Sequence, residues 1–153
     1  MKIRTSLLTV AALFVGVLVC FASPHMGTWK LNDAKSKLSA GASKNTDVVY
    51  AAAGDSIKVT VDGTDAAGKA IHNEWTGKFD GKDYPVTGDT SSDSRAYKQV
   101  NDHTLAMTIK KDGKVTMTGH IVVSADGKSR TVTVTGTDAK GKKTTSTSVY
   151  DKQ

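Results

Sequence analysis

The sequence predicts an all-β fold, an antiparallel up-and-down meander of about eight to ten strands that closes into a barrel after an N-terminal signal helix. Two observations lead to this prediction. From Thr46 onward, short runs rich in Val, Thr and Ile alternate apolar with polar residues, as strands with one buried face do. Glycine-containing turns separate these runs at intervals of roughly 8 to 14 residues, as in a chain of hairpins.

Ten segments fit the strand pattern. They span residues 27–31, 46–53, 56–62, 70–79, 84–87, 95–100, 104–110, 115–123, 129–137 and 143–151. Asp-Gly pairs at 80–81, 112–113 and 126–127 supply the positive φ that tight hairpin turns need. Residues 32–45, rich in Lys, Ser, Ala and Gly, are irregular, and we expect one helical turn there or a loop across the barrel mouth.

One face of the predicted strands is apolar, and the other carries mostly Thr, Lys, Ser and His. The apolar set is Ile57, Val59, Val61, Ile71, Trp75, Phe79, Leu105, Met107, Ile109, Val115, Met117, Ile121, Val123, Val132 and Val134. Such a sheet has to bury its apolar face, and sequential hairpins favour a barrel over a two-layer sandwich. We expect Trp75, Met107, Met117 and Val134 to be buried, with Lys58, Thr60, Thr116 and Thr133 exposed.

The first 22 residues have the pattern of a secretory signal peptide. Lys2 and Arg4 precede an uncharged stretch from Thr5 to Phe21, and the small residues Ala22 and Ser23 follow it. We therefore expect a signal peptide at 1–22, one domain at 23–153 and a secreted or periplasmic protein. The alternative is that residues 1–22 stay attached as a membrane helix, and the chain would contact a membrane only through that helix. Cleavage removes Cys20 and with it all thiol chemistry. It also lowers the formal charge from +6 to +4, because Lys2 and Arg4 are lost.

The first strand opens with Gly27, Thr28, Trp29, Lys30 and Leu31. This Gly-x-Trp motif resembles the opening of the lipocalins, and Gly-Thr-Trp-Lys-Leu is similar to the start of the intracellular fatty-acid-binding proteins. Both families are meander barrels of the calycin type that bind small apolar ligands inside. In lipocalins the tryptophan packs against an arginine near the last strand. This chain offers Arg95 and Arg130, and neither stands where the lipocalin pattern places it.

The resemblance and the valine-rich inner face favour an exported lipocalin-like protein that binds a small hydrophobic ligand without catalysis. The residues expected to line the interior are Trp29, Trp75, Phe79, Met107, Met117 and Ile121. The alternative is a filled barrel acting as an envelope or extracellular interaction module, whose Thr- and Lys-rich surface contacts a polysaccharide or a protein. A large interior void distinguishes the first function from the second.

Motifs for catalysis, cofactors, metals or nucleic acid do not emerge from the sequence. We therefore expect no enzyme activity, no cofactor, no metal site and no nucleic-acid partner. The histidines at 25, 72, 103 and 120 lack metal-ligand spacing and are interpreted as surface residues. A hydrolase would need buried polar groups, and Asn73 is the one polar residue assigned to the inner face.

One internal repeat stands out. Residues 61–69 read V-D-G-T-D-A-A-G-K, and residues 134–142 read V-T-G-T-D-A-K-G-K. Two hairpins that solve the same turn problem would explain the repeat, and so would a duplicated half-barrel.

Overall fold

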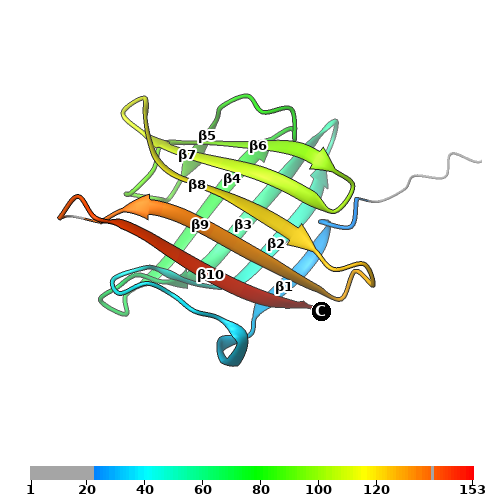
Figure 1. Cartoon of the computed structure of the whole chain (residues 1–153). Coiled ribbons are helices and arrows are strands. Elements are labelled where there is room, and N and C mark those ends of the chain that lie inside the picture. The colour runs from blue at the N-terminus through cyan, green and yellow to red at the C-terminus, as the bar shows by residue number, and fades with distance from the viewer. Residues whose placement is uncertain (1–22, 139) are drawn as a thin grey trace, which may run out of the picture.

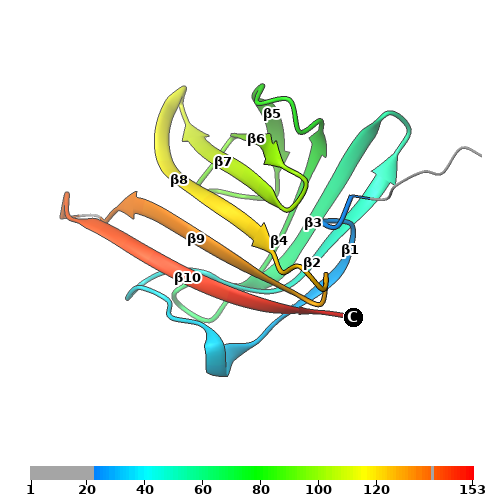
Figure 2. The same cartoon turned by 45° about the vertical axis from the view of Figure 1, so that its right-hand side comes forward.

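The chain forms a closed barrel of ten antiparallel strands in which each strand pairs with its neighbours in sequence and the last pairs with the first. The computed structural model describes residues 23–138 and 140–153, so the predicted signal peptide lies outside the described residues. Figures 1 and 2 show the strands wrapping around one interior. Their bounds are β1 Gly27–Leu31, β2 Lys44–Ala53, β3 Ser56–Thr64, β4 Ala70–Gly77, β5 Tyr84–Thr87, β6 Ser94–Asn101, β7 Thr104–Lys111, β8 Lys114–Val123, β9 Ser129–Thr137 and β10 Lys143–Lys152.

The predicted fold class is confirmed, and the ten predicted segments match the ten strands closely. Helical structure among the described residues is a single 3₁₀ turn, η1 (Asp33–Lys35), within the irregular segment 32–45. That segment runs along β10, where Lys37 and Thr147 form an isolated bridge. Ser39 hydrogen-bonds the hydroxyl of Ser146 at 2.8 Å.

The barrel has two ends, which we call the floor and the mouth. The floor holds residues 23–26 and the turns at 54–55, 102–103 and 124–128. The mouth holds the turns at 65–69, 112–113 and 138–142, and segment 32–43 runs along β10 before β2 begins there. At the floor, Met26 packs against the core, so the N-terminal residues fold into this end of the barrel.

The eight residues whose burial was predicted lie on the expected faces of the sheet, but not all of them are as buried or as exposed as predicted. Trp75 and Met107 are buried, whereas Met117 and Val134 are half-buried against the core. On the outer face Thr116 is exposed, and Lys58, Thr60 and Thr133 are half-buried.

The assignment of Val115 to the apolar face is wrong, because this residue is 55% exposed. A β-bulge between Ile109 and Lys110 pairs Ile109 with Met117 but Lys110 with Val115, which leaves Thr116 as the extra residue. An extra residue reverses the alternation on one strand beyond the bulge. Val115 therefore points outward, beside Lys110.

The repeated sequences form two turns of the same geometry. In the β3–β4 turn, Asp65 Oδ1 accepts hydrogen bonds from the amides of Ala67 and Lys69, both at 2.9 Å. In the β9–β10 turn, Asp138 Oδ1 accepts from Lys140 and Lys142, again at 2.9 Å. The turns lie six strands apart in a ten-stranded barrel, whereas a half-barrel duplication requires an offset of five. The repeat is therefore best explained as one turn solution used twice.

Candidate functional site

A buried arginine closes the floor of the barrel. Arg130 of β9 is 2% exposed, and its Cζ lies 4.9 Å from the ring centroids of Trp29 and Tyr50 and 4.7 Å from that of Tyr150. Lys152 adds a second cation, with Nζ 5.1 Å from the Trp29 centroid. A desolvated cation over an aromatic face contributes about 2 kcal/mol. These rings therefore stabilise a guanidinium that has no ion pair within the described residues.

The sequence did not predict which of the two arginines packs against Trp29. Arg130 packs on Trp29 because the closed barrel places β10 between β9 and β1. Tyr150 pairs with Leu31 of β1 on one side and with Arg130 of β9 on the other, and Trp29 pairs with Lys152 two residues along β10.

His25 is buried beneath the floor, so its interpretation as a surface residue is wrong. It is 1% exposed, it meets the Phe79 ring edge-on at a centroid distance of 6.2 Å, and its carbonyl accepts a hydrogen bond from Trp29 Nε1 at 2.9 Å. Neither of its ring nitrogens finds a partner in the described part of the chain. Burial, followed by the neighbouring Arg130, His103 and Lys152, lowers the pKa of His25 to about 4. The floor thus contains a neutral imidazole beside fixed positive charges.

The other histidines differ in their exposure. His72 is exposed on the outer face, where Nδ1 lies 2.6 Å from Asp62 Oδ1, and this hydrogen bond raises its pKa. His120 is exposed, and His103 is half-buried.

Aromatic side chains fill the barrel next to the floor. Trp75 contacts Tyr97 edge-on at 4.7 Å between centroids and stacks with Phe79 at 6.5 Å. Tyr50 contacts both Phe79 and Tyr97. Such contacts add about 0.5 to 1.5 kcal/mol per pair beyond the burial of area. This half of the interior is consequently a packed core.

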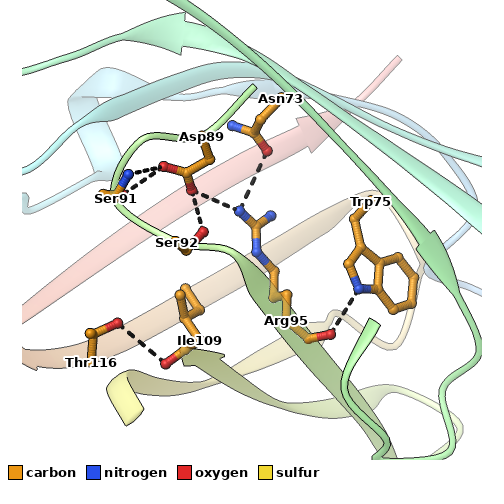
Figure 3. Close-up of polar contacts among 8 residues, drawn as sticks. All are labelled: Asn73, Trp75, Asp89, Ser91, Ser92, Arg95, Ile109 and Thr116. Atoms are coloured by element: carbon orange, nitrogen blue, oxygen red, sulfur yellow. Dashed lines mark hydrogen bonds and ion pairs between the residues drawn. The ribbon is translucent and has the colours of Figure 1, made fainter. Parts of the chain in front are cut away.

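A polar cluster lies inside the barrel toward the mouth, under the loop that joins β5 to β6 (Figure 3). Arg95 Nη2 lies 3.3 Å from Asp89 Oδ2 and 3.4 Å from Asn73 Oδ1. Ser92 donates to Asp89 Oδ2 at 2.5 Å, and Ser91 donates to Oδ1 at 2.7 Å. Burial opposes ionisation of Asp89, but the serine hydrogen bonds and the charge of Arg95 hold its pKa below the usual range.

The prediction that Asn73 is the one polar residue of the interior is wrong, because Arg95, Ser92 and Arg130 are also buried. The cluster holds the loop in place: Arg95 is anchored through its carbonyl, which accepts from Trp75 Nε1 at 2.8 Å. Because Arg95 and two serines surround the Asp89 carboxylate, the arrangement is that of a structural ion pair.

The inner wall formed by β8, β9 and β10 is less buried toward the mouth. Met117, Val132 and Val134 face inward but are half-buried, whereas Leu105 and Ile121 on the same sheet are 0% and 2% exposed. Ser146 and Ser148, paired with Val134 and Val132, share this wall and are half-buried as well. Solvent therefore reaches apolar and hydroxyl groups on the inside of the barrel at this end.

A shallow hollow of about 110 Å³ lies between β8 and β9 near the mouth. It is lined by Thr116, Thr118, Thr135 and Thr137, by Met117 and Gly136, and by Val115 and Lys143. Gly136 is required here, since an added Cβ would lie 2.6 Å from Met117 Cγ.

The six residues predicted to line the interior therefore occupy four environments. Trp29 lies in the arginine stack at the floor, Trp75 and Phe79 lie in the aromatic core, and Met107 and Ile121 are buried on the inner face of β7 and β8. Met117 lies at the half-buried wall and the hollow.

Arg130 and Tyr150 were not predicted from the sequence as residues of the floor, although the alternation of inward and outward residues along the strand indicates that Arg130 faces inward. Arg130 stands two residues before Val132 and four before Val134, both assigned to the apolar face. Period-two alternation therefore places Arg130 inside.

Comparison with known proteins does not assign the chain to a family. A scan against protein-family models finds no match, and a search of curated proteins finds no similar sequence. In the described ranges, His, Cys, Asp and Glu side chains do not gather in threes as metal ligands would. Nor do residues 23–138 and 140–153 contain a helix of the length and apolar character that crossing a bilayer takes.

Proposed function

We propose that residues 23–153 form an exported, non-catalytic binding protein that carries one small, mainly apolar molecule at the mouth end of the barrel. The observation that supports this function is the half-buried inner wall of Met117, Val132 and Val134. Apolar surface left in contact with water costs about 25 cal/mol per Å², so a ligand that covers this wall is stabilised there. Ser148 offers a hydroxyl for a polar group on the ligand, whereas the hydroxyl of Ser146 is hydrogen-bonded to Ser39.

The lipocalin-like interpretation gains support from the floor. A tryptophan in a Gly-x-Trp motif on β1 packs against a buried arginine, which is the combination that the resemblance implies. The floor is packed and the mouth is accessible, so the ligand enters from the mouth.

A second candidate is an interaction module with a filled barrel. The aromatic core of Trp75, Phe79, Tyr97 and Tyr50 favours it, because this core leaves the floor half of the interior without room for a ligand. The hollow of about 110 Å³ between β8 and β9 is smaller than the large interior void expected of a carrier, which also favours this second candidate. The two candidates differ in whether the mouth half takes up an apolar molecule.

Replacing Met117 by Trp tests the carrier function. A solvatochromic apolar probe should bind the unmodified residues 23–153 with one-to-one stoichiometry, and natural lipids should displace it. Met117→Trp should abolish probe binding while the protein remains folded, because added volume at the half-buried wall fills the ligand space. In a filled barrel the same change overpacks the core and costs about 1 to 3 kcal/mol of stability.

Val122→Trp is the matched control, since Val122 lies on the outer face of the same strand, is exposed, and is not part of the hollow. It should leave probe binding and stability unchanged. Absence of probe binding to the unmodified protein, together with destabilised Met117→Trp, would reject the carrier and favour the interaction module.

Export is tested by the intact mass of the protein recovered outside the cytoplasm. A mature N-terminus at or next to Ser23 is expected. A mass that retains residues 1–22, or a lipid adduct on Cys20, would contradict cleavage.

A further inference from the structure

We propose that the outer face of β7 to β10 is a binding surface for a neutral polysaccharide. This face consists of the outward positions in residues 104–108, 118–122, 131–135 and 145–149, and we call it the threonine face. Figure 1 shows the four strands side by side toward the viewer. The proposal concerns the outside of the barrel and does not rest on the carrier function.

The pairing register arranges the threonine face in rows across the four strands. One row is Thr108, Thr118, Thr135 and Thr145, in which each residue pairs directly with the next. Directly paired residues project from the same side of a sheet. The next two rows lie two and four residues further along each strand, toward the floor. Of the twelve positions in the three rows, eight are threonine.

The threonine face lacks ionised side chains, which is unusual for this chain. Its twelve positions include no Lys, Arg, Asp or Glu, although these make up 24% of all residues. The outer face of β2 to β4 provides the contrast, because its outward positions include Lys58, Asp62 and Glu74. There Lys58 and Glu74 form an ion pair, with 2.7 Å between Lys58 Nζ and Glu74 Oε1.

A charged partner does not fit this surface. Binding would strip water from the partner's charges, and the twelve positions hold no opposite charges to replace that water. The register places lysines only beside the ends of the middle row, with Lys98 paired to Ala106 and Lys37 to Thr147. A protein partner fits poorly too, because interface hot spots are built from Trp, Tyr and Arg, which are absent from the twelve positions. A neutral polymer rich in hydroxyl groups matches the face in charge.

Threonine has the chemistry that a sugar chain needs. Its hydroxyl both donates and accepts hydrogen bonds, and its methyl group covers the C–H patches of a sugar ring. The β-branched side chain is stiff about χ1, so little entropy is lost on binding. In a sheet such groups repeat about every 4.8 Å across strands and about every 6.7 Å along them, which suits a partner that is itself repetitive.

The hollow at the mouth provides a specific place on this surface. Thr118 and Thr135 of the first row line it, and Thr116, Thr137 and Lys143 extend the lining beyond that row. Its volume of about 110 Å³ accommodates part of one sugar unit. The rows would hold the chain, and the hollow would take one projecting group.

Co-sedimentation with insoluble cellulose and chitin, and electrophoresis through gels that contain soluble neutral glucans, test the proposal on residues 23–153. Binding to at least one neutral polysaccharide is expected, and it should persist in 0.5 M salt, where the Debye length is only about 4 to 5 Å. The double variant Thr118→Lys/Thr145→Lys should weaken binding at least tenfold. Thr118→Val should weaken it about fivefold, the equivalent of one hydrogen bond.

Thr60→Lys/Thr76→Lys is the matched control, because it adds the same charge to the outer face of β3 and β4. It should leave polysaccharide binding unchanged. Equal losses in both double variants, or retention that disappears in salt, would overturn the proposal. So would an absence of binding to all neutral polysaccharides. A concentration-dependent dimer in sedimentation velocity that Thr118→Lys abolishes would assign the face to a second copy instead.

Discussion

Acidification from pH 7 to pH 4 should destabilise the barrel through His25. In the folded protein the pKa of His25 is about 4, whereas an imidazole in the unfolded chain titrates near 6.5. Below pH 6.5 the unfolded state therefore binds a proton that the folded state rejects, and stability falls until the pH reaches about 4. One pH unit corresponds to about 1.4 kcal/mol, so the total loss is about 3 kcal/mol.

The physical origin is the floor of the barrel. His25 is 1% exposed, and the ionisable groups that influence it are Arg130, His103 and Lys152, none of which is an acid. Protonation would add a buried positive charge next to Arg130 and Lys152 without a counter-ion.

Urea unfolding followed by tryptophan fluorescence between pH 4.5 and 7.5 measures this effect, and NMR titration gives the pKa directly. His25→Phe should flatten the pH dependence in this window, because a phenyl ring fills the space against Phe79 without titrating. His120→Phe is the control, and it should keep the full slope because His120 is exposed. The reasoning is refuted if His25→Phe shows the slope of the unmodified protein, or if His25 titrates near 6.5.

Two further predictions concern packing. Arg130→Ala should lower the free energy of unfolding by about 3 kcal/mol or more, since it empties a site enclosed by three rings. Arg130→Met should lower it less, because the methionine side chain fills that site. Equal losses of stability in urea unfolding would contradict a packing role for Arg130. Gly136→Ala should lower the free energy of unfolding by about 1 to 3 kcal/mol, because the added Cβ would lie 2.6 Å from Met117 Cγ. Combining it with Met117→Ala should remove this extra loss. If the effects of the two substitutions simply add in a double-mutant cycle, the clash is excluded.

Alternation and turn chemistry were sufficient to predict the barrel from the sequence. Asp112 and Gly113 both adopt positive φ, at 50° and 72°, as a two-residue hairpin requires. Val115 shows where this reasoning stops, because a bulge inserts one residue without any change in composition. Bulges depend on how neighbouring strands align, and local patterns do not contain that information.

The floor could not be predicted from the sequence for a different reason. Arg130, Tyr50 and Tyr150 come from three separate strands and meet Trp29 because the barrel closes. His25 looked like a surface residue because it precedes the first strand by two positions, yet residues 23–26 fold into the floor. These residues become neighbours only because the barrel closes, and no short segment of the sequence contains that information.

The seam between β1 and β10 has a consequence for the order of folding. Trp29 pairs with Lys152, so the barrel closes through residues near the two ends of the chain. Hairpins such as β2–β3 and β7–β8 form from local contacts, whereas the seam requires closure of a loop of more than a hundred residues and is entropically late. Until β10 has been synthesised, β1 presents an unpaired edge on which other strands can add. We therefore expect the stacking of Arg130 on Trp29 to form late in folding, and truncation within β10 to leave an open, aggregation-prone sheet.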